Sequence, residues 1–480
     1  MKILFAASEA APYVKSGGLG DVMEALPSEL AKNDDVEVSV FLPYYKSIKS
    51  NPRFNLEFVT SFSTMLSWRQ THVGIFKSYS VNKKVTYYFI DNEYYFNRDG
   101  SYYGYYDDGE RFAYFSKAIL ESLHHLNYYP DIIHLNDWQT AAIPVLLKAF
   151  YAKIPDYSKI KTVFTIHNIE YQGKMPMEFL TEIMGFSNSW KSVMKDVNCN
   201  CINFMKSAIL LSDKITTVSK TYSYEIRHPY FSHGLDTVLK ENEDKLIGIV
   251  NGINTKIYNP RTDKHLPFNY SSSDLLGKAA CKKALQQELN LPVRNDVPII
   301  SLITRLVSHK GLDLIECVLS SILNMDVQLV VEGTGDQKYE DMFKFSEYNS
   351  PNKMAAVIKF DSDLASRIYA GSDLFLMPSK SEPCGLAQLI AMRYGTIPIV
   401  RETGGLVDTV PPLNIDTLEG KGFTFKLFNA HDMLNAIERA VSFWHNESKR
   451  EEHIKNLIKY DSSWKNPVWE YMNLYSELVK

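Results

Sequence analysis

The chain has 480 residues with a formal net charge of −4, and 45% of the residues are apolar. This length predicts two or three domains, each large enough to bury a core of its own. The nearly balanced charge excludes the strongly basic surface typical of nucleic-acid-binding proteins, and no apolar stretch approaches the roughly 20 residues of a membrane span.

The five cysteines are few and scattered, and the N-terminus is a short apolar run followed directly by Glu9. An odd number of cysteines without a Cys-x-x-Cys pair favours a reducing compartment and argues against structural zinc. The N-terminal run predicts a strand rather than a signal peptide. We expect a soluble cytoplasmic protein, although a plastid protein that had lost its transit peptide would look the same.

A glycine-rich loop follows the first predicted strand, residues 3–7. The loop reads KSGGLGD over residues 15–21 and leads into a helix with apolar periodicity. Its spacing is neither that of a Walker A loop nor that of the dinucleotide-binding fingerprint. The glycines allow the backbone to approach a diphosphate or a glucosyl group closely, and Lys15 can supply positive charge.

A β-rich insertion and a tyrosine-rich loop come next. Residues 36–42 predict a second buried strand, and residues 50–95 alternate β-branched or aromatic residues with polar ones, which indicates further strands. Residues 94–112 are rich in Tyr, Asp and Gly. This segment is either a loop that flanks a binding site or an ordinary surface loop.

Two polar clusters follow buried strands in the first half of the chain. Asp137 ends the segment DIIHLND, and His167 ends the strand at residues 162–166 and begins the segment HNIEYQG. A carboxylate at a strand end can orient a hydroxyl group or stabilise positive charge. Asp137 could instead cap the helix expected to begin near Thr140.

A domain boundary is predicted near Asp244, and a second parallel sheet begins at residues 297–303. The strand at residues 297–303 is followed by Arg305 and Lys310. Two cations at one strand end suit a diphosphate whose charge rises as it leaves. Exposed Arg and Lys side chains on a solvated face are the alternative.

Residues 373–410 predict a strand–loop–helix–strand–loop–helix unit of a parallel sheet. The first loop carries Glu382, and the second carries bare glycine amides at a helix start, where an anion is favoured. Ligands of such sheets bind at the carboxyl ends of the strands. A carboxylate beside amides predicts a sugar-nucleotide site.

These motifs together resemble those of bacterial glycogen synthases and plant starch synthases, which are retaining glucosyltransferases of glycosyltransferase family 5. The resemblance extends over essentially the whole chain. The sequence departs from the family pattern at Gln139, Asn254 and Tyr258, and Ile390 replaces the second glutamate of the Glu-x₇-Glu pattern.

The resemblance implies an α/β protein with the GT-B fold, in which two Rossmann-like domains with parallel sheets face each other across a deep cleft. The N-terminal, acceptor-side domain is expected at residues 1–244 and is joined by a terminal helix at residues 459–480. The sugar-nucleotide-binding domain is expected at residues 245–458.

The implied function is transfer of glucose from ADP-glucose to the non-reducing-end 4-hydroxyl group of an α-1,4-glucan such as glycogen, starch or a maltooligosaccharide. The anomeric configuration is retained, and no metal, cofactor, nucleic acid or membrane is involved. Three alternatives stay open: use of UDP-glucose, a catalytically silent glucan-binding protein, and a phosphorylase-like enzyme with pyridoxal phosphate.

The resemblance also assigns site residues. Arg305 and Lys310 stabilise the diphosphate, Glu382 and His167 hold the glucose, and Asp137 acts on the acceptor side. The substrate-binding residues carried over from the family are Lys15, Gly17, Gly18, Asp21, Asn251, Cys384, Gly385, Leu386, Thr403, Gly404 and Gly405.

Overall fold

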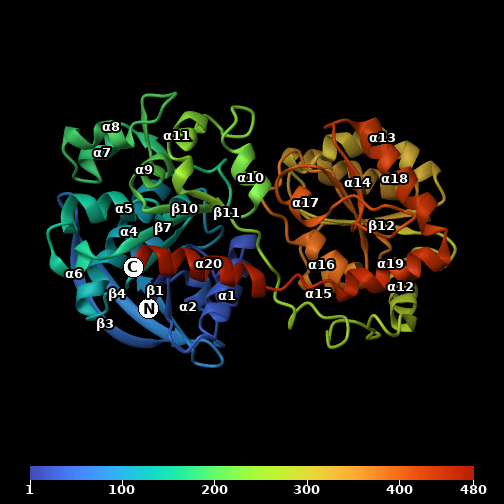
Figure 1. The fold of residues 1–480 in the computed structure, drawn as a ribbon, viewed down its shortest axis with the longest axis horizontal. Helices are drawn as coiled ribbons and strands as arrows, with labels where there is room; N and C mark the ends of the chain where they lie inside the picture. The colour runs from blue at the N-terminus through green and yellow to red at the C-terminus, as the bar shows by residue number, and fades with distance from the viewer. The chain divides into compact units, whose positions relative to one another are not determined.

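The computed structural model describes residues 1–480, which form two compact units (Figure 1). Unit 1 comprises Met1–Asn251 and Trp464–Lys480, and unit 2 comprises Gly252–Ser463. The sequence-based limits at residues 244 and 458 lie shortly before these two divisions. The functional roles assigned to the two domains remain a prediction.

Unit 1 is built on a nine-stranded sheet in the order β11-β10-β7-β6-β1-β2-β5-β4-β3. The pairs are parallel except those of β3 with β4 and β4 with β5. The strands are β1 Lys2–Ala6, β2 Glu37–Pro43, β3 Glu57–Leu66, β4 Arg69–Tyr79, β5 Val85–Asp91, β6 Ile132–Asn136, β7 Lys161–Ile166, β10 Lys214–Thr217 and β11 Leu246–Gly248. Strands β3 to β5 confirm the expected β-rich insertion.

The middle of this sheet is buried on both faces because its strands are nearly continuous apolar runs. Strand β1 lies between β6 and β2 and is parallel to both. Later strands are added on one side of β1 first and then on the other side, so the strand order reverses at β1. Ligands of open parallel sheets bind at such a switch point, outside the carboxyl ends of the strands.

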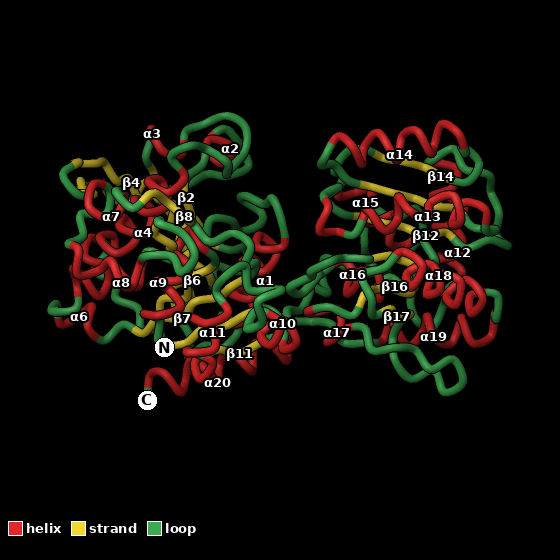
Figure 2. The backbone as a smooth tube through the Cα atoms, turned by 90° about the horizontal axis from the view of Figure 1, so that it is seen from above, coloured by secondary structure: helices red, strands yellow, loops and turns green.

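The helices of unit 1 cover this sheet (Figure 2). They are α1 Gly18–Leu30, α2 Lys46–Lys49, α3 Glu93–Phe96, α4 Asp108–His125, α5 Ile143–Leu146, α6 Pro155–Ser158, α7 Phe179–Glu182, α8 Lys191–Met194, α9 Phe204–Leu211, α10 Lys220–Glu225, α11 Asp236–Glu241 and α20 Lys465–Val479. A small two-stranded antiparallel sheet of β8 (Lys174–Pro176) and β9 (Cys201–Asn203) completes this unit.

The C-terminal helix α20 belongs to unit 1, as the sequence analysis expected for the terminal segment. The hydroxyl of Tyr475 in α20 lies 2.6 Å from Nδ1 of His134 in β6. Both side chains are buried, and Nε2 of His134 lies 2.5 Å from Oγ1 of Thr165 in β7. A chain of hydrogen bonds thus fixes the terminal helix to two central strands.

One local expectation was wrong. The segment at residues 94–112 is not one loop, because most of α3 and the start of α4 lie within it. The helix expected to begin near Thr140 is α5, which follows a short 3₁₀ turn, Trp138–Thr140.

Unit 2 is built on a fully parallel six-stranded sheet in the order β14-β13-β12-β15-β16-β17. The strands are β12 Ile299–Ile303, β13 Gln328–Glu332, β14 Met354–Val357, β15 Leu374–Met377, β16 Ile397–Arg401 and β17 Phe423–Phe425. The switch point lies at β12, which pairs with β13 on one side and with β15 on the other.

The helices of unit 2 bury apolar faces against this sheet in a large core and a smaller second cluster. They are α12 Leu276–Glu288, α13 Leu312–Asn324, α14 Gln337–Asn349, α15 Ser362–Gly371, α16 Ala387–Arg393, α17 Gly404–Thr409, α18 Ala430–Trp444 and α19 Glu447–Lys459. No helix in residues 1–480 combines the length and the apolarity that a membrane crossing requires.

Candidate active site

The loops after β12 and β15 meet at the switch point of unit 2. Nζ of Lys310 donates a hydrogen bond to Oε2 of Glu382 at 2.7 Å, and Oγ of Ser379 donates to the same oxygen at 2.9 Å. The ion pair is largely shielded, since the side chains of Lys310 and Glu382 are 17% and 9% exposed. The structure thus brings together two of the five residues predicted to be catalytic.

The backbone holds these two loops in place. Gly311 has φ 75°, and a side chain there would lie 2.0 Å from the carbonyl oxygen of Pro378. The amide of Lys380 donates to the carbonyl of His309, and the Arg401 guanidinium donates to the carbonyl oxygens of Ser379 and Lys380. The Lys310–Glu382 pair is therefore positioned before any ligand binds.

Arg305 lies in the loop that also carries Lys310, but its environment differs. Its side chain is exposed, whereas Lys310 is paired with Glu382. The two cations predicted to stabilise a diphosphate thus differ in their surroundings, and their shared role stays a prediction. Unlike Lys310, Arg305 is not paired with Glu382. An incoming anion would therefore meet the full positive charge of Arg305.

At least one glycine amide near the start of α17 is already engaged within the protein. The amide of Gly405 donates to the carbonyl oxygens of Glu382 and Pro383, and a side chain there would lie 2.3 Å from the carbonyl oxygen of Cys384. The expectation of bare amides was wrong for Gly405. This glycine instead allows the loop that carries Glu382 to pack against the helix start.

The other predicted residues of these loops lie close by in the sequence and the fold. Cys384 is buried, Gly385 has φ 72°, and Leu386 immediately precedes α16. Thr403 occupies the N-cap position of α17, and Gly404 is its first residue.

In unit 1, the glycine-rich loop joins β1 to α1. Nζ of Lys15 donates to Oδ1 of Asp21 at 2.7 Å, and burial raises the pKa of Asp21 although Lys15 opposes this shift. Gly17 is the N-cap residue of α1, and a Cβ there would meet no atom within 4 Å. Gly18, the first residue of the helix, and Gly17 thus lie beside open space at a helix N-terminus, where anions bind.

Glu9 is a site residue that the sequence analysis missed. It is 3% exposed, and its carboxylate accepts hydrogen bonds from the backbone N–H and the hydroxyl of Ser16 and from the Tyr103 hydroxyl. Glu9 thus holds the glycine-rich loop. A glutamate directly after a buried strand was the available signal, and it was used only to exclude a signal peptide.

Asp137 lies at the end of β6 in a disfavoured backbone conformation, with φ 57° and ψ −177°. For a residue other than glycine, such a conformation costs free energy and is found mainly at functional sites. Its Oδ1 accepts hydrogen bonds from the backbone N–H groups of His167 and Asn168. Its side chain makes no capping bond, so the alternative role as a helix cap was wrong.

Burial raises the pKa of Asp137 to about 7. The hydrogen bonds from His167 and Asn168 lower it, and the charge of Glu9 raises it further. Asp137 therefore changes its charge near neutral pH.

His167 lies at the end of the neighbouring strand β7, and its Nε2 is 2.9 Å from Oδ1 of Asn136. The Asn136 amide nitrogen donates to the carbonyl oxygens of Ala6 and His134, so Oδ1 is the acceptor and Nε2 of His167 carries the proton. Burial lowers the pKa of His167 to about 3, so the ring is neutral. Its Nδ1 is left as an acceptor for a hydroxyl group.

Asn251, at the end of unit 1, is 6% exposed, and its Oδ1 has no hydrogen-bond partner. A buried amide oxygen without a partner costs free energy and often marks the place of a ligand. None of the predicted site residues belongs to the cluster of Asp196, Cys199 and Cys201, whose possible ligand atoms lie within 4.8 Å of one another.

The comparisons with known proteins cover the whole chain. The family model for the starch synthase catalytic domain matches residues 2–241, and the model for glycosyl transferases group 1 matches residues 286–460. Glycogen synthases from Clostridium acetobutylicum and Bacillus cereus are 49% and 47% identical to this chain, with 100% of each chain covered.

A solved structure gives the same result. The catalytic domain of starch synthase IV from Arabidopsis thaliana, bound to ADP and acarbose, is 34% identical with a TM-score of 0.92. The match covers 100% of this chain and 99% of that domain. Sucrose-phosphate synthase from Thermosynechococcus elongatus, 16% identical with a TM-score of 0.63 and covering 99% of this chain and 98% of its own, shares the fold. The predicted GT-B fold is confirmed, and the chain belongs to the glycogen synthase and starch synthase family of glycosyltransferases.

Proposed function

We propose that this chain transfers glucose from ADP-glucose to the non-reducing-end 4-hydroxyl group of an α-1,4-glucan, with retention of configuration. The observation that carries the proposal is the Lys310–Glu382 ion pair at the switch point of unit 2. It places a cation and a carboxylate where a parallel sheet binds its ligand, in a chain related over its full length to glycogen synthases.

The donor is held by unit 2 in this proposal. Arg305 binds the diphosphate through its uncompensated charge, and Lys310 adds a second cation as the negative charge on the leaving group grows. Glu382 accepts hydrogen bonds from glucose hydroxyls. The buried thiol of Cys384 packs beside the sugar, and the backbone from Cys384 to Leu386 contacts it, while Thr403 and Gly404 face the phosphates.

Unit 1 provides the remaining groups. Nδ1 of His167 accepts a hydrogen bond from a glucose hydroxyl, and ionised Asp137 stabilises the positive charge that develops on the sugar or orients the acceptor hydroxyl. Lys15, with Gly17, Gly18 and Asp21, forms an anion-binding helix start, and Oδ1 of Asn251 accepts from a substrate hydroxyl.

Retention follows from displacement on one face of the sugar. The acceptor oxygen forms its bond to the anomeric carbon on the side from which the diphosphate oxygen departs. The acceptor proton passes to an oxygen of the leaving diphosphate. Glu382 is not the nucleophile, because Lys310 and Ser379 already donate to one of its oxygens and favour its role as a fixed acceptor. No metal is required, since the cations stabilise the diphosphate.

The test is a parallel incubation with radiolabelled ADP-glucose or UDP-glucose and a maltooligosaccharide acceptor. We expect faster incorporation from ADP-glucose into a product that an α-1,4-specific hydrolase digests completely. Incorporation from UDP-glucose alone would favour the other donor, and no incorporation would favour a silent glucan-binding protein. An absorbance band of pyridoxal phosphate would favour the phosphorylase-like alternative.

A further inference from the structure

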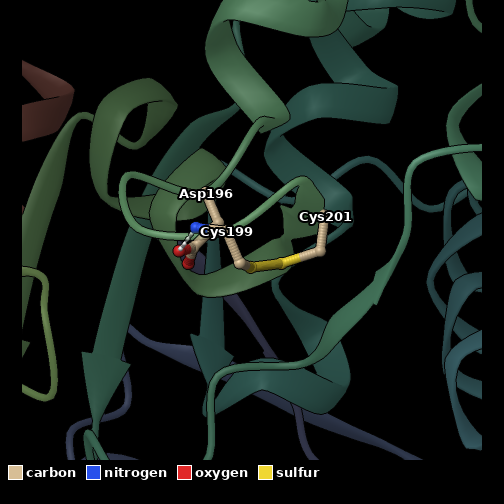
Figure 3. Close-up of side chains that lie close together, drawn as sticks. All are labelled: Asp196, Cys199 and Cys201. Atoms are coloured by element: carbon tan, nitrogen blue, oxygen red, sulfur yellow. Dashed lines mark hydrogen bonds between the residues drawn. A yellow bond between two sulfur atoms is a disulfide. The ribbon is translucent and has the colours of Figure 1, made fainter.

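Cys199, two residues before strand β9, and Cys201, the first residue of that strand, form a disulfide in unit 1 (Figure 3). The few scattered cysteines had favoured a reducing compartment, so no disulfide was expected from the sequence. Cys199 is exposed and Cys201 partly exposed, so a thiol reagent can reach the pair. The bridge closes a loop of three residues, so its reduction removes little chain-entropy stabilisation and need not unfold the protein.

The Asp196 carboxylate holds this loop. Its Oδ1 accepts from the backbone N–H groups of Asn198 and Cys199, and the backbone N–H of Asp196 donates to the carbonyl of Cys201 at 2.8 Å. Asp196 is 4% exposed. Burial opposes ionisation, but hydrogen bonds from Asn203, Asn198 and Lys174 lower the pKa of Asp196 below its ordinary value, so the carboxylate stays charged.

The other carboxylate oxygen connects the disulfide loop to the segment that carries His167. Oδ2 of Asp196 accepts from Nδ2 of Asn203 at 2.7 Å, and the same nitrogen donates to Oε1 of Gln172 at 2.7 Å. Nε2 of Gln172 donates to the carbonyl oxygens of Ile169 and His233. All of these side chains are buried, so a displaced partner cannot be replaced by bulk water without cost.

A second hydrogen bond also connects the disulfide loop to the neighbourhood of Gln172. Asn198 lies between Asp196 and Cys199 in the sequence, and its Nδ2 donates to the carbonyl of Gly234 at 3.2 Å. Gln172 contacts the adjacent carbonyl of His233. The disulfide loop and the segment at residues 167–173 therefore share two points of attachment. The backbone N–H groups of His167 and Asn168 in that segment hold the Asp137 carboxylate.

We propose that Cys199 and Cys201 are a reversible thiol–disulfide modification site whose oxidation state sets the order of residues 167–173 and thereby the rate of glucosyl transfer. The oxidised pair fixes the loop at Asp196 and supports the active arrangement. Reduction releases this loop, and the change passes through Asn203 and Gln172. The inference rests on the proposed roles of Asp137 and His167 for its effect on rate.

The exchange needs a disulfide as oxidant, such as oxidised glutathione. The exposed Cys199 thiolate attacks one sulfur of that disulfide, which forms a mixed disulfide and releases one thiolate. The Cys201 thiolate then attacks Sγ of Cys199 and releases the second thiolate. The protein loses two electrons and two protons, and the oxidant becomes two thiols. A dithiol reverses both steps.

A metal site at the same residues is disfavoured by the hydrogen bonds. Both oxygens of Asp196 are already engaged by N–H donors, and the Lys174 ammonium lies 3.2 Å from Oδ2. A metal ion would have to displace these donors and bind beside a positive charge. Thiol–disulfide exchange requires neither change.

The experiment compares the full chain after equilibration with oxidised glutathione or with dithiothreitol. Differential alkylation and mass spectrometry report the state of the two thiols, and hydrogen exchange of the peptide covering residues 167–173 reports its order. We expect protection of both thiols from alkylation after oxidation. After reduction we expect faster exchange in that peptide and about fivefold slower glucosyl transfer, the lower end of typical coupling between sites.

Variants separate this site from the other cysteines. Cys199→Ser and Cys201→Ser should each stay in the low-rate, fast-exchanging state in both solutions. Cys317→Ser removes an exposed cysteine elsewhere and should respond as the unmodified chain does. Alkylation of both thiols after oxidation would overturn the modification site. Complete oxidation without a change in hydrogen exchange or transfer rate would overturn the coupling between the disulfide and residues 167–173. The hydrogen-exchange measurement tests this coupling even if the proposed glucosyl transfer is wrong.

Discussion

The sheets of the two units present their ligand-binding edges in the same way but with different electrostatics. In unit 2, Lys310 and Glu382 form a shielded ion pair, and Arg305 is exposed. In unit 1, His167 is neutral, with a pKa of about 3, and Asp137 has a pKa of about 7. One edge is therefore organised around an ion pair, and the other around a carboxyl group without a cationic partner.

The difference arises from the partners that each sheet supplies. Glu382 is buried beside a cation, which compensates for the loss of water. Asp137 is partly buried against two backbone N–H groups, and Glu9 is the charged group that raises its pKa further. The same topology can thus surround a carboxylate with a cation or with backbone N–H groups alone.

The largest effect should come from the cations of unit 2. Arg305→Ala and Lys310→Ala should each lower kcat about 10²–10³-fold, because each removes a group that stabilises the leaving diphosphate. Initial-rate measurements with ADP-glucose check this. Arg261→Ala, which removes another exposed arginine of unit 2, should keep the unmodified kcat.

Thermal unfolding sharpens this comparison. Arg305 is exposed, so Arg305→Ala should leave Tm unchanged, whereas Lys310→Ala leaves the Glu382 carboxylate buried without its cation and should lower Tm. Unchanged kcat in both variants would be incompatible with the proposed diphosphate site.

In unit 1, Asp137→Asn should lower kcat about 10²-fold, since a neutral amide cannot stabilise positive charge. The folded-state pKa of about 7 lies above that of an unfolded carboxyl group. The folded state therefore binds more protons between about pH 4 and 7, and stability is lost as pH rises through this window. Asp137→Asn has no ionisable group at this position and so does not lose stability in this pH window. Its Tm at about pH 8 should therefore exceed that of the unmodified chain. A lower Tm together with full activity would contradict the role of Asp137.

The pH profile tests the role of Asp137 directly. If ionised Asp137 is the active form, kcat/KM should fall with decreasing pH below about 7, by up to tenfold per pH unit. His167 stays neutral over this range and should not contribute. A profile that is flat from about pH 5 to 8 would show that Asp137 does not control the rate.

A smaller effect is expected from Glu9, which positions the glycine-rich loop. Glu9→Gln should raise KM for ADP-glucose about tenfold, because an amide nitrogen cannot accept from Ser16 or Tyr103. Tyr103→Phe removes one of these hydrogen bonds and should have a weaker effect. Equal KM values for Glu9→Gln and the unmodified chain would exclude this positioning role.

The smallest effect is expected from chelation. Because cations of the protein stabilise the diphosphate, EDTA should leave the rate of transfer unchanged. The measurement is an initial rate before and after chelation. A loss of rate that Mg²⁺ alone restores would show that the cations of unit 2 do not replace a metal.

The sequence alone determined the parts of this protein that depend on local patterns. Buried strands are continuous apolar runs, so the unit at residues 373–410 was predicted to begin with a strand, which is β15, and loops at strand ends identified Asp137, His167, Lys310 and Glu382 as candidates. The departures were also local, since the tyrosine-rich segment at residues 94–112 contains most of α3 and the start of α4, which its composition concealed.

Only the tertiary structure decided which of these residues share an environment. The contact between Lys310 and Glu382 joins positions 72 residues apart, and the hydrogen bond from the His167 amide to Asp137 joins positions 30 residues apart. Burial and neighbours set the pKa of Asp137, and the packing of β9 brings Cys199 and Cys201 next to the network of Asp196. These properties depend on distances through space, which strand order and loop packing determine and local sequence patterns do not contain.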